Sequence, residues 1–251
     1  MLSIVVLAYH TTPDATLTDE CVASIDRQEL PAVSCEKWVL DNGSTPPIKE
    51  YKHWGLVHKP VNVGNIEGQN DCFLLSDTDW VLFVSNDVRL EASCIKALWD
   101  ERFNGQLMPV ILNKDLSIQS YGGRLVWPGY GFNILKHRVC QDYSLDYVPS
   151  ICYLMPKSLW RDIGWFDEVY PYAYEDVDMG LRFGSGRLRC SKDAFAVHLG
   201  NATLGFKNNR NFVEGRMRLV NKHYRGLDRL LRLSTMKALS KIPIHPTKVI
   251  G

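Results

Sequence analysis

The stretch Trp80-Val-Leu-Phe-Val-Ser-Asn-Asp-Val88 joins a continuous apolar run to three polar residues, and this pattern decides the fold. A short run rich in Val, Leu and aromatic residues is typical of a strand that is buried on both faces. Similar runs are found at Leu2–Ala8, Lys37–Leu40 and Gly55–His58. Ligands of open α/β sheets bind beyond the carboxyl ends of such strands, so the polar residues that follow each run are the candidate site residues.

Helix-like stretches separate these runs. Helices are predicted from the N-cap Asp14 through Gln28, over Asn65–Ser76 and over Glu91–Arg102. Strands that alternate with helices predict an α/β fold with a mixed, mainly parallel, twisted sheet flanked by helices. The segment from Leu107 to Tyr147 is rich in Gly, Tyr and Trp, which favours loops and short strands around a cleft. Further elements are predicted at Ile151–Leu154 (strand), Pro156–Ile163 (helix), Tyr174–Phe183 (helix) and Ala194–His198 (strand).

Length and composition are those of a folded globular protein. The 251 residues, 45% hydrophobic and 23% charged, are enough for one large domain or a domain plus a tail. Seven scattered cysteines without a Cys-x-x-Cys pair predict free thiols in a reducing compartment. The N-terminal apolar run lacks a basic lead and is too short to span a bilayer. We therefore expect a cytoplasmic protein. A peripheral contact with the inner face of the membrane is compatible with this prediction.

Charge is distributed unevenly along the chain. Residues 207–251 hold 11 Lys and Arg against two Asp and Glu, a net +9, whereas the remainder carries −8. The tail also reads as helical, with leucines among the basic residues. It could rest on an anionic membrane, hold a polyanion, or pack on the preceding domain or a second subunit while its charges stay solvated. No recognised nucleic-acid-binding motif is present, which argues against a nucleic-acid partner.

Five blocks in order resemble the family 2 glycosyltransferases of GT-A fold, including rhamnosyltransferase-like members. They are Ser3-Ile-Val-Val-Leu-Ala-Tyr-His10, Val39-Leu-Asp-Asn-Gly-Ser44, Asn62-Val-Gly64, Trp80–Val88, and Asp146–His198 with its Gly164-Trp-Phe-Asp167 and Glu175-Asp-Val-Asp178. The resemblance implies a Rossmann-like catalytic domain over 1–206. Residues 1–104 would form the nucleotide-sugar-binding half and 105–206 the acceptor and catalytic half, with 207–251 as a basic helical extension.

The reaction that this resemblance implies is a metal-assisted, inverting transfer. A sugar would move from a UDP- or dTDP-type donor to a hydroxyl of a glycan, a glycoconjugate or a lipid-linked acceptor. Two rivals stay open: a sugar nucleotidyltransferase, which the absence of a Gly-rich basic loop disfavours, and a degenerate nucleotide-sugar-binding protein. The second is suggested by Ser85, which stands where the family's Asp-x-Asp motif has its first carboxylate.

Asp87 and His198 are the expected metal ligands. By resemblance, Asp87 holds the ion beneath the donor diphosphate and His198 follows the final strand as a second ligand. One carboxylate, one imidazole and phosphate oxygens suit Mn²⁺ or Mg²⁺, and the ion would offset charge on the leaving group. The plainer readings are a turn aspartate and a hydrogen-bonded structural histidine.

Asp176 is the expected base and Glu175 the residue that orients the acceptor or the base. Inversion requires a carboxylate to accept the proton of the acceptor hydroxyl. Both acids open a predicted helix, where nearby N–H groups favour the ionised form. The plainer reading is that acids are common at helix N-termini.

Donor and acceptor contacts complete the predicted site. Asp41 resembles the residue that accepts a hydrogen bond from the nucleobase imide, and Tyr9 would pack on the base or ribose. The remaining expected donor contacts are Asn62, Gly64 and Asn86. The floor of the acceptor site is expected at Trp165, Phe166 and Asp167, because aromatic rings stack on sugar faces, although such rings are also common in cores.

Overall fold

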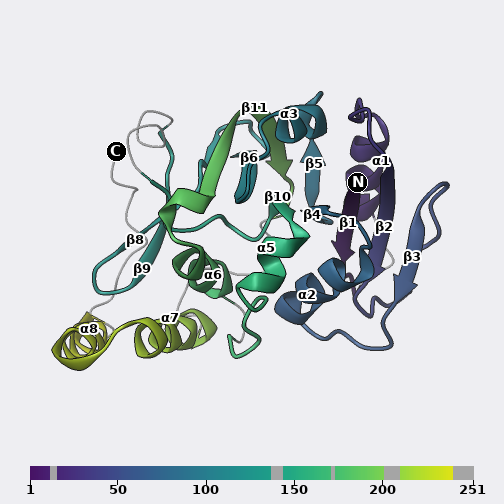
Figure 1. Ribbon diagram of the computed structural model, residues 1–251. Helices are drawn as coiled ribbons and strands as arrows, with labels where there is room; N and C mark the ends of the chain where they lie inside the picture. Colours follow the sequence, from purple (N-terminus) through teal and green to yellow (C-terminus); the bar gives the residue numbers. More distant parts are fainter. Residues whose placement is uncertain (12–15, 137–143, 171–172, 201–209, 240–251) are drawn as a thin grey trace.

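The computed structural model describes residues 1–11, 16–136, 144–170, 173–200 and 210–239 (Figure 1). Its centre is a nine-stranded sheet of order β3-β2-β1-β4-β10-β6-β11-β5, with β7 paired to β6. β1, β2, β3, β4, β6 and β11 run in one direction, and β5, β7 and β10 run against them. The prediction of a mixed, mainly parallel sheet flanked by helices is confirmed.

The first half of the chain builds the parallel part of the sheet. β1 (Leu2–Ala8) lies between β2 (Cys35–Asp41) and β4 (Trp80–Ser85), and β3 (Gly55–His58) pairs with β2 at the sheet edge. β1 is buried along its whole length, as its continuous apolar sequence predicts. The helices of this half are α1 (Thr16–Asp26), α2 (Asn65–Leu75) and α3 (Cys94–Asp100).

Two details of this half differ from the predictions. The helix expected to start near residue 91 begins at Cys94, because the preceding β5 (Val88–Leu90) pairs with β11. Long-range pairing of this kind leaves no local signal in so short a segment. The expected N-cap, Asp14, lies outside the described residues.

The second half closes the sheet with strands of both directions. β10 (Cys152–Pro156) runs antiparallel between β4 and β6 (Gln106–Leu112), and β11 (Leu188–His198) pairs with β6. β7 (Ile118–Ser120) flanks β6. A separate hairpin of β8 (Gly123–Val126) and β9 (Tyr130–Asn133) projects beside the sheet (Figure 1). The remaining elements are α5 (Lys157–Asp162), α6 (Glu175–Phe183) and the 3₁₀ turn Ser185–Arg187.

The basic extension is helical over its described part, in α7 (Arg210–His223) and α8 (Gly226–Leu239). α7 contacts α6 and buries Leu219 and Val220 fully, so it packs on the α/β body of the protein (Figure 1). α8 instead exposes Leu227, Leu230 and Leu231. No helix in the described ranges has the length and apolar character that a membrane crossing needs.

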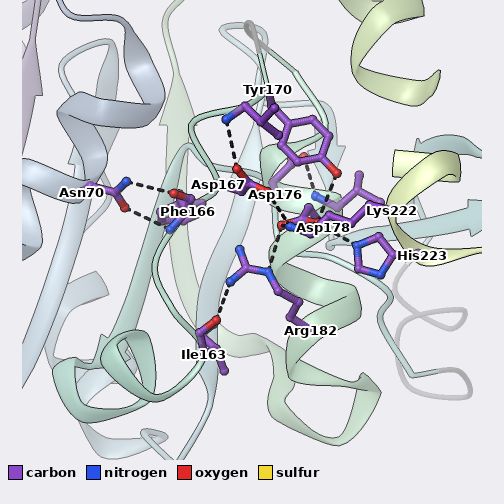
Figure 2. Close-up of polar contacts among 12 residues, drawn as sticks. Asn70, Ile163, Phe166, Asp167, Tyr170, Asp176, Asp178, Arg182, Lys222 and His223 are labelled. Atoms are coloured by element: carbon purple, nitrogen blue, oxygen red, sulfur yellow. Dashed lines mark hydrogen bonds and ion pairs between the residues drawn. The ribbon is translucent and has the colours of Figure 1, made fainter. Parts of the chain in front are cut away.

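A buried carboxylate fastens α7 to α6, as Figure 2 shows. Asp178 is completely buried, and its oxygens lie 2.7 Å from His223 Nε2, 2.8 Å from Lys222 Nζ and 2.9 Å from Arg182 Nε. Lys222 also contacts Asp167 at 2.6 Å. Burial alone would raise the pKa of Asp178, but the hydrogen bonds from His223 and Lys222 and the charge of Arg182 lower it to about 2. The carboxylate therefore stays ionised and joins the side chains of Arg182, Lys222 and His223.

We expect Asp178→Asn to lower the free energy of unfolding by about 2 kcal/mol, because it removes a buried carboxylate that accepts hydrogen bonds from three partly exposed basic side chains. The pKa of Asp178 is depressed, so its stabilising contribution is present above pH ~4 and is lost as the pH falls toward about 2. Urea titrations between pH 2 and pH 7 measure both effects.

The matched control is Asp228→Asn. Asp228 pairs with Arg232 at the surface, and exposed pairs contribute about 1 kcal/mol or less. Equal losses in the two variants would contradict the role of Asp178.

Candidate active site

The carboxyl ends of the central strands meet at one edge of the sheet. Ala8 pairs with Asp41, and Leu7 pairs with Ser85. The chain stays tied to this edge beyond the strands, because the Asn42 N–H donates to the Ala8 carbonyl at 2.8 Å and the Asn86 N–H to the Leu7 carbonyl at 3.1 Å. The polar residues that follow β1, β2 and β4 are thereby brought together, as expected for a parallel sheet.

Asp87 and His198 meet at this edge although 111 positions separate them. The ladder between β5 and β11 pairs Val88 with His198 and sets the Asp87 Oδ2 atom 3.0 Å from His198 Nε2. The Ser85 hydroxyl donates to Asp87 Oδ1 at 2.7 Å. Burial tends to raise the pKa of Asp87, but these hydrogen bonds and the nearby imidazole lower it below the ordinary value. The carboxylate is therefore ionised at neutral pH.

The pair fits one divalent ion. Two ligand atoms that bind an ion at ~2.1 Å and at right angles lie about 3 Å apart, which matches the Oδ2–Nε2 distance of 3.0 Å. Gly200 keeps this space open, because a Cβ there would collide with Asp87 Oδ2 and lie 3.2 Å from His198 Nε2. The described residues contain no cluster of three or more acidic, His or Cys ligands, so diphosphate oxygens and water would complete the coordination.

Gln119 contacts the ring nitrogen of His198 that does not face Asp87. Its side-chain amide lies 3.1 Å from His198 Nδ1. When Gln119 Oε1 accepts the Nδ1 proton, Nε2 presents a lone pair toward Asp87, and such partners fix the tautomer of metal-binding histidines. Sequence reasoning missed Gln119, because β7 is a three-residue strand whose place beside His198 is set by long-range pairing.

Asp176 reaches the same edge through the start of β10. The backbone N–H of Ser150 stabilises the Asp176 carboxylate. The next residue, Ile151, accepts a 2.9 Å hydrogen bond from the N–H of Ser85, whose hydroxyl contacts Asp87. A short path of contacts thus connects the predicted base with the predicted metal ligand.

Burial controls the acid pair at the start of α6. It raises the pKa of Asp176 to about 6, against the backbone N–H groups of Val177 and Ser150, which lower it. Burial and the charge of Asp176 raise the pKa of Glu175 well above its ordinary value, and Glu175 Oε2 has no hydrogen-bond partner. The N–H groups at the helix N-terminus do favour the ionised form of Asp176, as expected, but desolvation outweighs them and sets the direction of the net pKa shift.

The predicted nucleobase contact is buried beneath the edge. Asp41 is 1% exposed. Its Oδ1 accepts from the Ser44 N–H at 2.9 Å, and its Oδ2 contacts the Ile48 N–H at 3.0 Å and His58 Nδ1 at 2.7 Å. Burial opposes ionisation, but these hydrogen bonds lower the pKa of Asp41. In this structure Asp41 organises the loop after β2 and orients His58, whose side chain is 46% exposed.

The other predicted donor residues differ in availability. Tyr9 is 42% exposed at the end of β1 and is free to pack on a ring. Asn62 Oδ1 accepts from the Asn42 side-chain amide and the Gly64 N–H, and these contacts shape the loop before α2. The Asn86 side chain donates to Thr18 of α1 at 2.9 Å, so it ties α1 to the sheet instead of facing the edge.

The predicted acceptor residues split into three roles. Trp165 is 42% exposed, and its ring stacks on the ring of Trp160 with 5.0 Å between the ring centres. One aromatic surface is thereby left open to solvent. Phe166 is 2% exposed, and both of its backbone polar groups bond the Asn70 side chain (Figure 2), so the structure places it in the core and corrects the acceptor-contact prediction. Asp167 is paired with Lys222 of α7.

Together these features define the class of protein. A twisted α/β sheet with an ionised aspartate and a histidine beyond its strand ends, and a second carboxylate of raised pKa nearby, is the arrangement of a GT-A glycosyltransferase. The model of glycosyl transferase family 2 matches residues 3–154, more than half of the chain, and the protein belongs to this family.

Solved structures of the same fold are similar over most of the chain. GalNAc-T7 with UDP, GalNAc and Mn²⁺ has a TM-score of 0.68 at 10% identity, over 88% of this chain and 47% of that one. S. aureus TarS has a TM-score of 0.58 at 15% identity, over 94% and 42%. S. aureus TarS 1-349 with UDP-GlcNAc has a TM-score of 0.57 at 16% identity, over 88% of this chain and 66% of that one. The chain thus spans about half the length of the first two, and identities this low show the fold alone. Among curated proteins no match was found.

We expect Asp176→Asn to stabilise the protein at alkaline pH. The folded-state pKa is raised to about 6, so the stability that the neutral carboxyl gives is complete below pH ~4 and is lost as the pH rises through about 6. Asparagine avoids the buried charge. The melting temperature should rise by about 2–6 °C at pH 8 and differ little at pH 4.

The control is Asp162→Asn, which alters an exposed acid at the end of α5. Thermal scans that show no pH-dependent difference between Asp176→Asn and wild type would contradict the buried-charge assignment.

Proposed function

We propose that the protein transfers a sugar from a nucleotide diphosphate to an acceptor hydroxyl with inversion at the anomeric carbon. Asp87 and His198 hold a divalent metal, and Asp176 is the base. The observation that carries the proposal is the convergence of these residues at one sheet edge, through the 3.0 Å pair and the contacts of Ser85 with Ile151. The two aspartates suit different roles. The lowered pKa of Asp87 keeps it ionised as a metal ligand, and the raised pKa of Asp176 makes it a stronger base.

The donor is proposed to be a UDP- or dTDP-type sugar. Structures of the same fold contain UDP, UDP-GlcNAc and, in one case, Mn²⁺. Tyr9 packs on the base or ribose, while Asp41 and His58 form the polar boundary of the base site. A bound Mn²⁺ or Mg²⁺ would neutralise charge on the departing diphosphate. The Ser85 hydroxyl supports Asp87 as a hydrogen-bond donor, at the position where the family's motif has its first carboxylate.

The transfer is a single displacement. The acceptor oxygen forms a bond to the anomeric carbon while the bond from that carbon to the diphosphate oxygen breaks, and the diphosphate departs with the electron pair. Asp176 accepts the proton of the acceptor hydroxyl. A carboxylate with a pKa near 6 is mostly ionised at pH 7 and is a stronger base than an ordinary aspartate. Glu175, whose pKa is raised by burial and by the charge of Asp176, orients the base or the acceptor.

The acceptor is proposed to be a glycan or a lipid-linked glycan, and Trp165 offers a stacking surface for one of its rings. Free thiols at the six cysteines that the structure describes support a reducing, cytoplasmic compartment. The exposed leucines of α8 support peripheral membrane contact as a further part of this proposal. Several basic residues of the extension already form ion pairs within the fold, including Arg218, Lys222 and Arg232. These pairs argue against the hypothesis that the extension binds a polyanion.

Asp176→Asn tests the base directly. We expect kcat to fall by about 10³-fold, while the affinity for UDP in the presence of Mn²⁺ changes by less than about twofold, because the donor site is intact. In the wild type, kcat/KM should rise with pH and level off above an apparent pKa of about 6. Steady-state transfer assays and UDP calorimetry provide both readouts, and Asp162→Asn is the control. Unchanged turnover in Asp176→Asn would end the assignment.

The metal pair has its own test. Asp87→Asn and Gly200→Ala should each weaken Mn²⁺ binding in the presence of UDP, the first by removing the charged ligand and the second by filling the space beside it. Gln119→Ala should weaken it by about 10-fold by releasing the imidazole. Electron paramagnetic resonance of free Mn²⁺ gives the affinity without an activity assay. Asp115→Asn, an exposed acid, is the control. Wild-type affinity in all three variants would contradict the proposed metal site.

A further inference from the structure

α7 carries a buried cation that the fold itself does not neutralise. Arg216 is 8% exposed, and its Nε atom has no hydrogen-bond partner. Within the described part of the chain, no carboxylate forms an ion pair with it: Glu214 of the same helix pairs with Arg218 at 2.6 Å, and Asp178 is occupied by its own cations. A buried charge without a counter-charge is costly, so such groups are normally paired or hold a ligand.

The anchoring of α7 does not need this charge. Lys222 and His223 fasten the end of the helix to Asp178. Earlier in the helix, Gly215 lies so close to the backbone of Ala173 that a Cβ at 215 would collide with the Ala173 carbonyl oxygen. The helix position is thus explained by other contacts, and the guanidinium of Arg216 is not.

Arg216 lies beside aromatic rings next to the acid pair. Its guanidinium carbon is 3.9 Å from the centre of the Tyr130 ring, in the β8–β9 hairpin. Tyr174, which directly precedes Glu175, lies within electrostatic reach of two opposite charges. Burial raises the pKa of Tyr174, the charge of Arg216 lowers it, and the charge of Asp176 raises it. A Cβ at Gly215, the residue before Arg216, would lie 3.4 Å from Tyr174 Cδ2. This part of α7 therefore lies against Tyr174, the residue that precedes the acid pair, and against the hairpin.

The contacts that lead from Asp87 to Asp176 run through Ser85, Ile151 and Ser150, whereas Arg216 lies against Tyr130 of the hairpin. The proposed mechanism puts the donor on the Asp87 side and leaves the Tyr174 side of the acid pair for the acceptor. A base must touch the acceptor hydroxyl, so acceptor groups next to that hydroxyl extend away from the donor. A planar guanidinium with aromatic neighbours matches phosphate or carboxylate groups through paired hydrogen bonds.

We infer that Arg216, with Tyr130 and Tyr174, forms a subsite for an anionic group of the acceptor, a phosphate or a carboxylate next to the hydroxyl that receives the sugar. This inference rests on the proposed function, because it names the chemistry of the acceptor for that same site. It gives the basic extension a specific part in substrate binding: α7 completes the acceptor site with one positive charge.

Three sugars that differ in one group test the subsite: glucose 6-phosphate, glucuronate and glucose. Dissociation constants are measured by ligand-observed NMR on the full chain, with Mn²⁺ and saturating UDP so that the donor site is filled. We expect at least one anionic sugar to bind about tenfold more tightly than glucose, the gain of a charge-assisted hydrogen bond. A preference for glucose 6-phosphate indicates phosphate, and a preference for glucuronate indicates carboxylate.

Arg216→Met should abolish this preference, and Arg218→Met, two positions along the same helix, should retain it. Equal binding of the three sugars by wild type, or a preference that persists in Arg216→Met, overturns the inference. If Arg216→Met does not fold, the same binding measurements are made on Arg216→Gln. Equal binding of the three sugars by wild type would by itself exclude the subsite.

UDP calorimetry separates this inference from the proposed function. UDP affinity should be the same in wild type and Arg216→Met. A loss of UDP affinity in Arg216→Met would assign the charge to the donor phosphates and overturn the acceptor subsite. An absence of UDP binding in wild type would contradict the donor site itself. The comparison of the three sugars would still test the anionic subsite at Arg216.

Discussion

The antiparallel pairing of β10 with β4 is the interaction on which the site depends. Because β10 runs against β4, its first residue, Cys152, lies beside Val84 near the carboxyl end of β4. The preceding Ser150 and Ile151 are therefore carried to the edge where Asp87 follows β4. A parallel strand in this position would start at the opposite edge and leave Asp176 without its contact to Ser150. One reversal of strand direction thus brings the residues that precede β10 and those that follow β4 to the same edge of the sheet.

Two aspartates of α6 show how local surroundings give neighbouring carboxylates opposite properties. Asp176 and Asp178 both lie in the first turn, so the helix dipole acts on them alike. Asp178 faces His223, Lys222 and Arg182, which hold its pKa near 2. Asp176 faces a buried site without a cation partner, and its pKa is raised to about 6. The helix end sets neither value; the groups that α7 and the β10 loop bring to each carboxylate do.

The parts of the fold and site that could be predicted are those with a local signal. Continuous apolar runs define β1 and β4, and the polar residues after them mark the edge where Asp87 lies. Position at a strand end does not determine where a side chain points, so Asn86 and Asp41, which bond within the fold, could not be told apart from Tyr9, which stays open. Gln119 and Arg216 left no signal at all, because their importance comes from partners far along the chain.

The basic extension shows why net charge alone was a poor guide to function. Its +9 suggested a surface that attracts anions over a broad area. In the structure, Lys222 and His223 contact a buried aspartate, Arg218 and Arg232 pair with acids of their own helices, and Arg225 bonds backbone carbonyls at the end of α7. A charge that is already paired contributes little to a distant partner, whereas a buried and unpaired one has a strong preference for a single anion. The position of Arg216 beside the acid pair therefore says more about the extension than the sum of its charges.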